Sequence, residues 1–236
     1  MIVTHAAWEI RSIMRNGEQL MVTFILPIIA LIALLHIDGV GLPEPHSAYA
    51  VAGTLAMAVI ASSFTSQAIS IAFDRRWGVL RMFSTTPLGP RGLLLGKAIA
   101  VAVVVVVQVL VLIAIAGLAG AWPVPSLSVA VLVSLTVCLG TLTFVALALC
   151  IGGTLRPEAV LAVANIAFVL MVIAGGVLMP VGPGLTGWFL LLTPFGALGE
   201  AMRGAILGTL PMTPLLVEAV WAVLLSFIAV RFFRWD

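Results

Sequence analysis

The sequence predicts an all-α membrane protein of a single domain, and three observations support this fold class. Charged residues make up 8% of the 236 residues and hydrophobic residues 63%, which leaves too few polar groups to cover a globule in water. The apolar residues gather in long stretches, and about 20 apolar residues are enough for a helix to cross a bilayer. The ten-residue alternation of polar and apolar positions that marks a membrane β-barrel is absent from the sequence.

Residues 1–17 predict an interfacial amphipathic helix rather than a span. The two faces of this helix are an apolar stripe (Val3, Ala7, Ile10, Met14) and a polar stripe (His5, Glu9, Ser12, Asn16). Trp8, Arg11 and Arg15 suit the headgroup region, so we expect the helix to lie on the cytoplasmic leaflet. A frayed cytosolic tail is the alternative.

Six apolar stretches follow, and each predicts a transmembrane helix. They are residues 19–37, 48–72, 97–121, 126–151, 158–179 and 212–233. An even number of spans places both termini on the same side of the membrane. The positive-inside rule identifies that side as cytoplasmic, because all Lys and Arg residues except Arg203 fall on it. We therefore expect a multi-pass protein of the cell (inner, cytoplasmic) membrane.

Residues 180–210, between the fifth and sixth stretches, predict an outer re-entrant segment. They are apolar but interrupted by prolines and glycines, and the two halves, 180–192 and 194–208, are each too short to span. Glu200 and Arg203 are about one helical turn apart, so we expect the two side chains to pair with each other.

The cytoplasmic loop at residues 73–92 is the strongly charged island of the sequence. It includes Asp74, Arg75, Arg76, Trp77 and Arg81. A short helix with Asp74 near its start and Arg81 near its end would match the helix dipole, and Trp77 would fill a pocket on a partner. The alternative is a plain juxtamembrane loop whose arginines set the topology and contact anionic lipid.

Polar residues inside the spans suggest packing contacts or a passage. Ser63, Gln67 and Ser70 fall on one helical stripe of the second span, and we favour helix packing over a translocation path for them. Gln108 and Asn165 are also interpreted as packing residues. For Glu218 in the sixth span we favour outward snorkelling or a pair with Arg203, and proton sensing is the alternative.

The sequence contains no set of residues that predicts catalysis, a metal site or nucleotide binding by this chain. The Gly-Lys pair at Gly96-Lys97 lacks the other glycine, the hydroxyl residue and the preceding strand of a phosphate-binding loop. The three histidines, His5, His36 and His46, are scattered and are expected at the surface. The two cysteines are expected to be inert core thiols.

The whole arrangement resembles the permease subunit of the ATP-binding-cassette (ABC) type 2 exporters, which export drugs, antibiotics, lipids and polysaccharides. The residues that carry the resemblance are Glu9, Arg11, Arg15, Pro27, Asp74 to Leu80, Thr86-Pro87-Leu88, Gly96-Lys97, Gly175 to Pro180 and Thr193-Pro194. The order of the charged-x-x-x-Gly-x-Leu, Thr-Pro-Leu and Gly-Lys motifs is the specific part. The chain departs from the family pattern at Asp74, where glutamate is common, and in the proline-rich segment after Pro180.

The resemblance implies a six-helix domain that pairs with a second permease chain, identical or related, and binds two copies of a separate ATPase. ATP and Mg would then be bound by the ATPase, and this chain would not be an enzyme. The segment from Asp74 to Arg81, with Gly78 and Leu80, would be the coupling helix, and Trp8 and Arg11 would lie nearby.

These expectations favour an exporter of a hydrophobic or amphipathic substrate that resembles a drug, an antibiotic or a lipid. The low aromatic content argues against sugar polymers. The alternatives are a non-transporting membrane assembly or channel subunit and a lipid-modifying membrane enzyme. We expect the bilayer as a partner and no nucleic acid.

Overall fold

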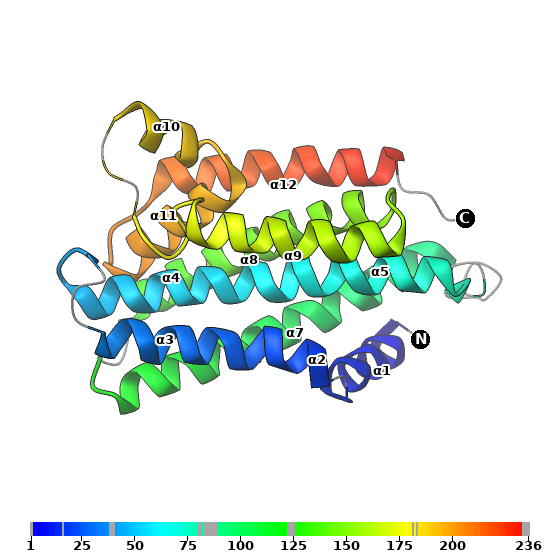
Figure 1. The fold of residues 1–236 in the computed structure, drawn as a ribbon, viewed down its shortest axis with the longest axis horizontal. Coiled ribbons are helices and arrows are strands. Elements are labelled where there is room, and N and C mark those ends of the chain that lie inside the picture. The colour runs from blue at the N-terminus through cyan, green and yellow to red at the C-terminus, as the bar shows by residue number, and fades with distance from the viewer. Residues whose placement is uncertain are drawn as a thin grey trace.

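The computed structural model of the chain describes residues 2–15, 17–37, 41–79, 82, 89–121, 126–180, 182 and 184–232. Within these ranges all regular elements are helices, which confirms the all-α class. The long helices run side by side along the longest axis of the molecule, and α1 lies across one end of this bundle (Figure 1).

The helices follow the predicted stretches closely. In chain order they are α1 (Ile2–Arg15), α2 (Gly17–Leu20), the π-helical turn η1 (Met21–Ile25), α3 (Leu26–His36), α4 (His46–Ile60), the π-helical turn η2 (Ala61–Thr65), α5 (Ser66–Arg76), α7 (Gly89–Leu118), α8 (Leu127–Gly152), α9 (Pro157–Ile173), α10 (Leu185–Leu191), α11 (Pro194–Ile206) and α12 (Met212–Phe232).

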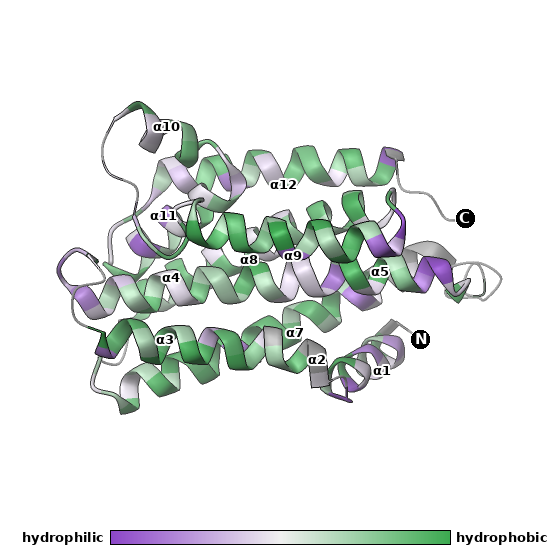
Figure 2. Ribbon diagram, viewed as in Figure 1, coloured by the Kyte–Doolittle hydropathy of each residue, from purple (hydrophilic) through white to green (hydrophobic). Residues whose placement is uncertain are grey.

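Among the described residues, four helical segments are long and apolar enough to cross a membrane, so four of the six predicted spans are supported by length and composition. These segments are His46–Arg76, Leu95–Leu118, Leu127–Gly152 and Met212–Arg231. The first and fifth predicted spans correspond to the shorter apolar helices Thr23–His36 and Pro157–Ile173. The fifth stretch was predicted too long because Gly176 has a positive φ of 76°, which ends helical geometry although the sequence stays apolar. Hydrophobic residues cover most of the bundle between its two ends (Figure 2).

The helix formed by α4, η2 and α5 is the centre of the fold. It runs without interruption from His46 to Arg76, and Leu55, Ile60 and Phe64 on it are fully buried. This central helix packs against α3, α7, α8, α9 and α11. It therefore connects the two ends of the molecule and contacts most of the other long helices.

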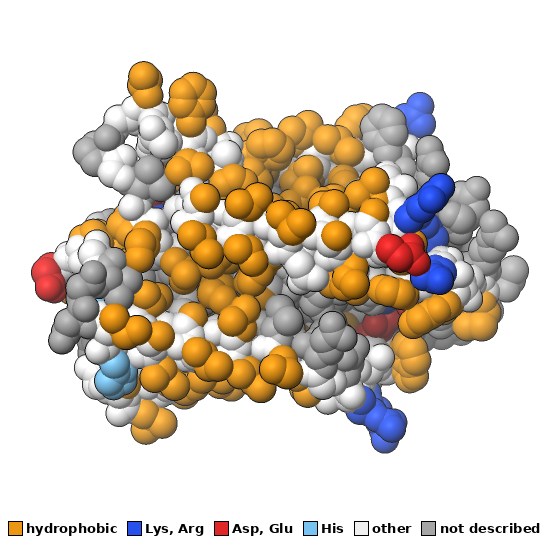
Figure 3. All heavy atoms as spheres, viewed as in Figure 1, with side chains coloured by type: hydrophobic (Ala, Val, Ile, Leu, Met, Phe, Trp, Pro, Cys, Tyr) orange, Lys and Arg blue, Asp and Glu red, His pale blue; other side chains and the backbone are white. Residues whose placement is uncertain are grey.

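The two ends of the bundle differ in charge. Side chains of Lys and Arg gather at the end where α1, the end of α5 and the end of α12 lie, whereas α10 lies at the other (Figures 1 and 3). We call the first the basic end; its described arginines belong to α1, α5, α12 and the residue before α9. The assignment of the basic end to the cytoplasm, and of α1 to a membrane surface, stays a prediction.

The segment predicted to be re-entrant contains two short helices, α10 and α11, separated at Thr193. The two differ in burial: most of α11 is buried against α4, α8 and α12, whereas α10 has no buried residue. Thr193 caps α11, since its hydroxyl accepts a hydrogen bond from the Gly196 amide. The depth of this pair in a membrane stays a prediction.

Candidate functional site

A buried ionic cluster joins α1, α5 and α7 at the basic end. The ammonium group of Lys97 lies 2.9 Å from Glu9 Oε1 and 2.6 Å from Asp74 Oδ2, and it donates a hydrogen bond to Ser70 Oγ at 3.3 Å. Lys97 is only 5% exposed, and His5 Nε2 lies 3.5 Å from Glu9 Oε1. We call these residues, His5, Glu9, Ser70, Asp74 and Lys97, the Lys97 cluster. A buried charge is tolerated when it is paired in this way.

The polar face of α1 turns inward to reach this cluster. The expectation that His5 lies at the surface is wrong, because His5 is 7% exposed and packs against α7. The contact requires a glycine at position 96, since a Cβ there would lie 2.4 Å from His5 Cδ2. Burial lowers the pKa of His5, against the opposing effect of the Glu9 carboxylate. The apolar residues Val3 and Met14 remain exposed on the outer side of α1.

The structure changes the interpretation of Asp74, which lies at the beginning of the charged loop. Asp74 was expected near the start of a short helix; instead it lies in the last turn of α5, which continues through Arg76. The physical reason is the pair with Lys97, which stabilises the carboxylate inside the bundle. α5 ends just before Gly78, where φ is +70°. Leu80 and Arg81 lie outside the described residues.

The arginines at the end of α5 bind residues of this chain. Arg75 Nη2 donates to the Leu155 carbonyl at 2.6 Å, and the guanidinium of Arg76 pairs with the Glu158 carboxylate at the start of α9. These contacts tie α5 to α9 at the basic end.

Two tryptophans are left exposed at the basic end. Trp77 is 71% exposed and contacts Phe73, with 5.3 Å between ring centroids. Trp8 is also exposed and stacks on His5, and Arg11 is exposed on the same helix. Of the predicted coupling residues, these three and Arg76, whose side chain is also exposed, therefore have surface available for a partner. Their contact with an ATPase stays a prediction.

The polar stripe of α5 and η2 lies inside the chain. Ser63 and Gln67 are buried and Ser70 is half-buried against Lys97. Neighbouring Ser62 donates to Gln108 Oε1 at 2.6 Å, and Gln108 also donates to the Thr23 carbonyl. The packing role expected for Gln108 agrees with these bonds. A translocation path along Ser63, Gln67 and Ser70 stays a prediction.

Glu218 is fully buried between α12 and α8, and this position corrects both interpretations that we favoured. Its Oε2 accepts a hydrogen bond of 2.7 Å from Thr143 Oγ1, so the side chain neither reaches the surface nor pairs with Arg203. Glu218 Oε1 has no partner among the described residues. No sequence signal pointed to Thr143, since an isolated threonine in an apolar helix is common.

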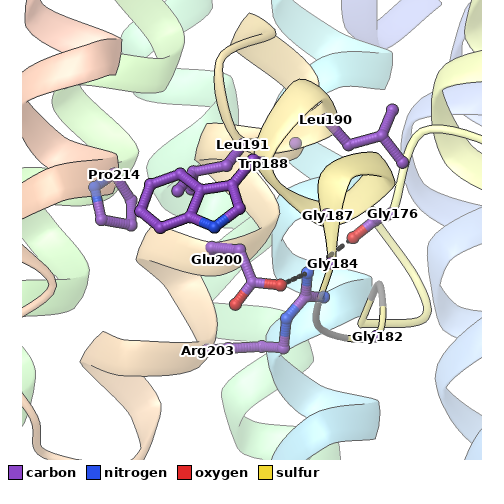
Figure 4. A pocket seen from close by; sticks show the side chains of 11 residues that line it. Gly176, Gly182, Gly184, Gly187, Trp188, Leu190, Leu191, Glu200, Arg203 and Pro214 are labelled. Atoms are coloured by element: carbon purple, nitrogen blue, oxygen red, sulfur yellow. Dashed lines mark hydrogen bonds and ion pairs between the residues drawn. The ribbon is translucent and has the colours of Figure 1, made fainter.

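The predicted pair of Glu200 and Arg203 is present on α11. Arg203 Nη2 lies 2.8 Å from Glu200 Oε1 and also donates to the Gly176 carbonyl at 2.6 Å, while Nη1 donates to the Val177 carbonyl at 3.0 Å. Both side chains line a cavity of about 400 Å³ between α10 and α11, which Trp188 and several glycines also line (Figure 4).

Three smaller sequence predictions concern metal binding, the two cysteines and Asn165. Across the described ranges, no group of three or more His, Cys, Asp or Glu side chains is placed to hold a metal ion. The two cysteines are free, and Cys138 was wrongly expected in the core, because its side chain is exposed on α8. Asn165 donates to the Leu161 carbonyl of its own helix.

A comparison with known protein families identifies the family of this chain. The sequence model described as "ABC-2 family transporter protein" matches residues 34–233, which covers every helix from the end of α3 to α12. A comparison with curated proteins finds no match. The match extends over most of the sequence, and its residues include Asp74, Lys97 and the α10–α11 segment. The chain therefore belongs to the ABC-2 family of transporter proteins.

Proposed function

We propose that this chain exports a hydrophobic or amphipathic molecule, with energy from ATP hydrolysed by a separate subunit. The observation that carries the proposal is the family match over residues 34–233, which makes the chain a permease subunit of an ABC transporter with an ATP-binding-cassette partner. The outward direction, a drug-like or lipidic substrate, two ATPase copies and a second permease chain are part of the proposal.

The basic end is the surface on which we place the ATPase. Trp8 and Trp77 are exposed there, and tryptophan is a frequent anchor at protein interfaces. The Lys97 cluster holds α1 to the end of α5, so the two tryptophans belong to one connected unit. A push on either one is therefore transmitted to the other.

The central helix supplies a route for this motion. It runs without a break from Arg76 at the basic end to His46 at the opposite end, where α4 packs against α11. A tilt of the basic end therefore displaces the helices beside the α10–α11 cavity. This is the mechanical link that the proposed alternating opening of an exporter requires.

The docking proposal is tested with Trp77→Ala and Trp8→Ala combined. We expect normal membrane insertion of this variant but loss of substrate-stimulated ATP hydrolysis in the reconstituted complex. Phe189→Ala, which removes an equally exposed ring at the opposite end, is the matched control. Trp77 is a cleaner target than Asp74, because Asp74 also holds the buried cluster. Full stimulation by the double variant would reject this docking surface.

The orientation is tested with a pair of cysteine variants in a background without Cys138 and Cys150. Ala119 follows α7 at the end opposite the basic end, and Ala159 lies in the first turn of α9 at the basic end; both are exposed. We expect Ala119→Cys to react with an impermeant maleimide added outside intact cells and Ala159→Cys to react only after lysis. The reverse pattern would overturn the assignment of the basic end to the cytoplasm.

A further inference from the structure

We propose that the cavity between α10 and α11 binds the ammonium group of an amphipathic ligand, with Glu200 and Trp188 as the recognition residues. The cavity measures about 400 Å³, which lies within the range of pockets that hold small molecules. We call it the α10–α11 pocket. The proposal names a ligand class for the proposed exporter, but the binding itself needs neither an ATPase nor transport.

The accessible charge in the pocket is negative. The guanidinium of Arg203 is 3% exposed and its two terminal nitrogens are occupied by Glu200 and by the carbonyls of Gly176 and Val177. A ligand therefore cannot reach this cation without breaking the structure. The Glu200 side chain is 37% exposed, and only its Oε1 is bound to Arg203. Its Oε2, which has no hydrogen bond among the described residues, is the charged atom that a ligand meets first.

An aromatic ring faces the same cavity. The indole of Trp188 lies on the α10 side of the pocket, and its side chain and that of Glu200 both point into the space (Figure 4). Trp188 is 63% exposed, so the ring is available to a ligand. A carboxylate beside an indole is a combination that binds alkylammonium groups, through charge attraction and through cation–π contact.

The remaining walls suit a headgroup with an attached apolar chain. Gly176, Gly184 and Gly187 line the pocket without side chains, so their backbone atoms form part of its wall. Outside the pocket, Leu185 at the first position of α10 is strongly exposed and extends the apolar surface. An ammonium headgroup therefore fits inside while a hydrocarbon tail lies against Leu185.

The experiment measures binding of radiolabelled choline to the purified full-length chain in dodecyl maltoside micelles, which contain no ammonium group. We expect saturable binding that dodecyltrimethylammonium displaces, whereas 3,3-dimethyl-1-butanol, the uncharged isostere of choline, does not. Displacement by phosphatidylethanolamine but not by phosphatidylglycerol identifies a lipid headgroup as the source of the ammonium. Displacement by the soluble amphiphile alone identifies a soluble cation. Absence of saturable choline binding, or equal displacement by the uncharged isostere, overturns the proposal.

Two variants and two matched controls locate the site. Glu200→Gln and Trp188→Leu are each expected to weaken choline binding about fivefold to tenfold, as loss of a partly exposed charge or ring contact does. Phe189→Leu changes the next ring on α10, and Glu44→Gln removes an exposed carboxylate outside the pocket; both should bind as the parent chain does. If Glu200→Gln does not fold, Trp188→Leu decides, because Trp188 is not among the hydrogen-bond partners of Arg203 in the described residues. Unchanged binding in Trp188→Leu overturns the site.

The outcomes for this site and for the proposed function are separable. Choline binding without ATPase stimulation would support the pocket and reject the coupled exporter. ATPase stimulation without choline binding would support the coupled exporter and reject the pocket as an ammonium site.

Discussion

The Lys97 cluster and the Glu200–Arg203 pair solve the same physical problem in different ways. Each holds one nearly inaccessible cation, and each sits near one end of the bundle. Lys97 takes its carboxylates from α1 and α5, which are distant in the sequence, whereas Arg203 takes its carboxylate from the same helix and two backbone carbonyls from the segment that follows α9. The first arrangement fixes three helices together, and the second fixes a local corner.

The difference predicts unequal consequences when each set of charges is disturbed. Removing Lys97 leaves two carboxylates facing each other in a buried site, whereas removing the Glu200 charge leaves Arg203 with its carbonyl partners. The stability of the basic end should therefore depend on ion pairing more strongly than that of the α10–α11 corner.

The largest effect is expected from Lys97→Ala. Loss of one partner from a buried ion pair costs about 3–5 kcal/mol, because the remaining charges are unpaired. We expect a lower unfolding free energy in detergent and loss of amide exchange protection in α1 first, since Glu9 would no longer hold α1 to the bundle. Arg11→Ala, at an exposed position of α1, is the control. Undiminished protection of α1 in Lys97→Ala would show that the cluster does not anchor this helix.

A smaller loss is expected from Gly96→Val, which leaves every charge in place. The new Cβ would lie 2.4 Å from the His5 ring, so α1 must move away from α7. Overpacking of this kind costs about 1–3 kcal/mol. Gly17→Val introduces the same side chain at a position where the new Cβ would have no atom within 4 Å, apart from its own helix backbone and chain neighbours. Gly96→Val should therefore lower the melting temperature more than Gly17→Val does. Equal melting temperatures would contradict the close contact.

The Glu200–Arg203 pair and the Lys97 cluster show what sequence reasoning can and cannot find. The pair of Glu200 and Arg203 was predictable, because a spacing of three residues on one helix brings two side chains together whatever the rest of the fold does. The partners of Lys97 were not, since Glu9 and Asp74 meet it only after three helices have packed. Gly96-Lys97 was considered as a possible phosphate loop and as a motif of the resemblance, although a glycine beside a lysine at the start of an apolar stretch is also compatible with a close helix contact and a buried charge.

The same limit applies to the helices. Hydropathy predicted the four long spans and the interruption at residues 180–210, because both are local properties of the sequence. It failed at Asp74, where charged residues suggested the end of the span although α5 continues to Arg76. It also failed for Glu218, whose partner Thr143 lies on another helix. Tertiary contacts stabilised helical or buried positions that local polarity argued against.

The comparison between the two ends of the bundle is sharpened by the stability of Glu200→Gln relative to that of Glu9→Gln. The Glu200 side chain is partly exposed, and its amide replacement still accepts a hydrogen bond from Arg203, so we expect a loss of no more than about 1 kcal/mol. The Glu9 side chain is buried, and the same change should cost more. Unfolding free energies of the two variants, measured in the same detergent, give the test. A larger loss for Glu200→Gln would reverse the ranking of the two ends.

The smallest effect concerns pH and arises only at the basic end. Burial lowers the pKa of His5 below its usual value of 6.5, although the carboxylates of Glu9 and Asp74 oppose this and Lys97 adds to it. Between the two pKa values the unfolded chain binds more protons than the folded one, so stability falls as the pH drops below about 6.5. We expect the protection factors of the α1 amides, which are corrected for the intrinsic pH dependence of exchange, to fall between pH 7.5 and pH 5.5, and His5→Asn to reduce that change.

The direction of this pH effect decides which force dominates in the Lys97 cluster. Protonated His5 would stand beside Lys97 in a site that excludes water, and it would also stand beside two carboxylates. Higher protection factors in α1 at pH 5.5 than at pH 7.5 would mean that the carboxylates outweigh burial and that the cluster has spare negative charge. In that case Lys97→Ala should be less harmful at pH 5.5 than at pH 7.5, because His5 would replace part of the missing charge. Lower protection factors at pH 5.5, together with a Lys97→Ala defect of similar size at both pH values, would instead show that Lys97 alone neutralises the site.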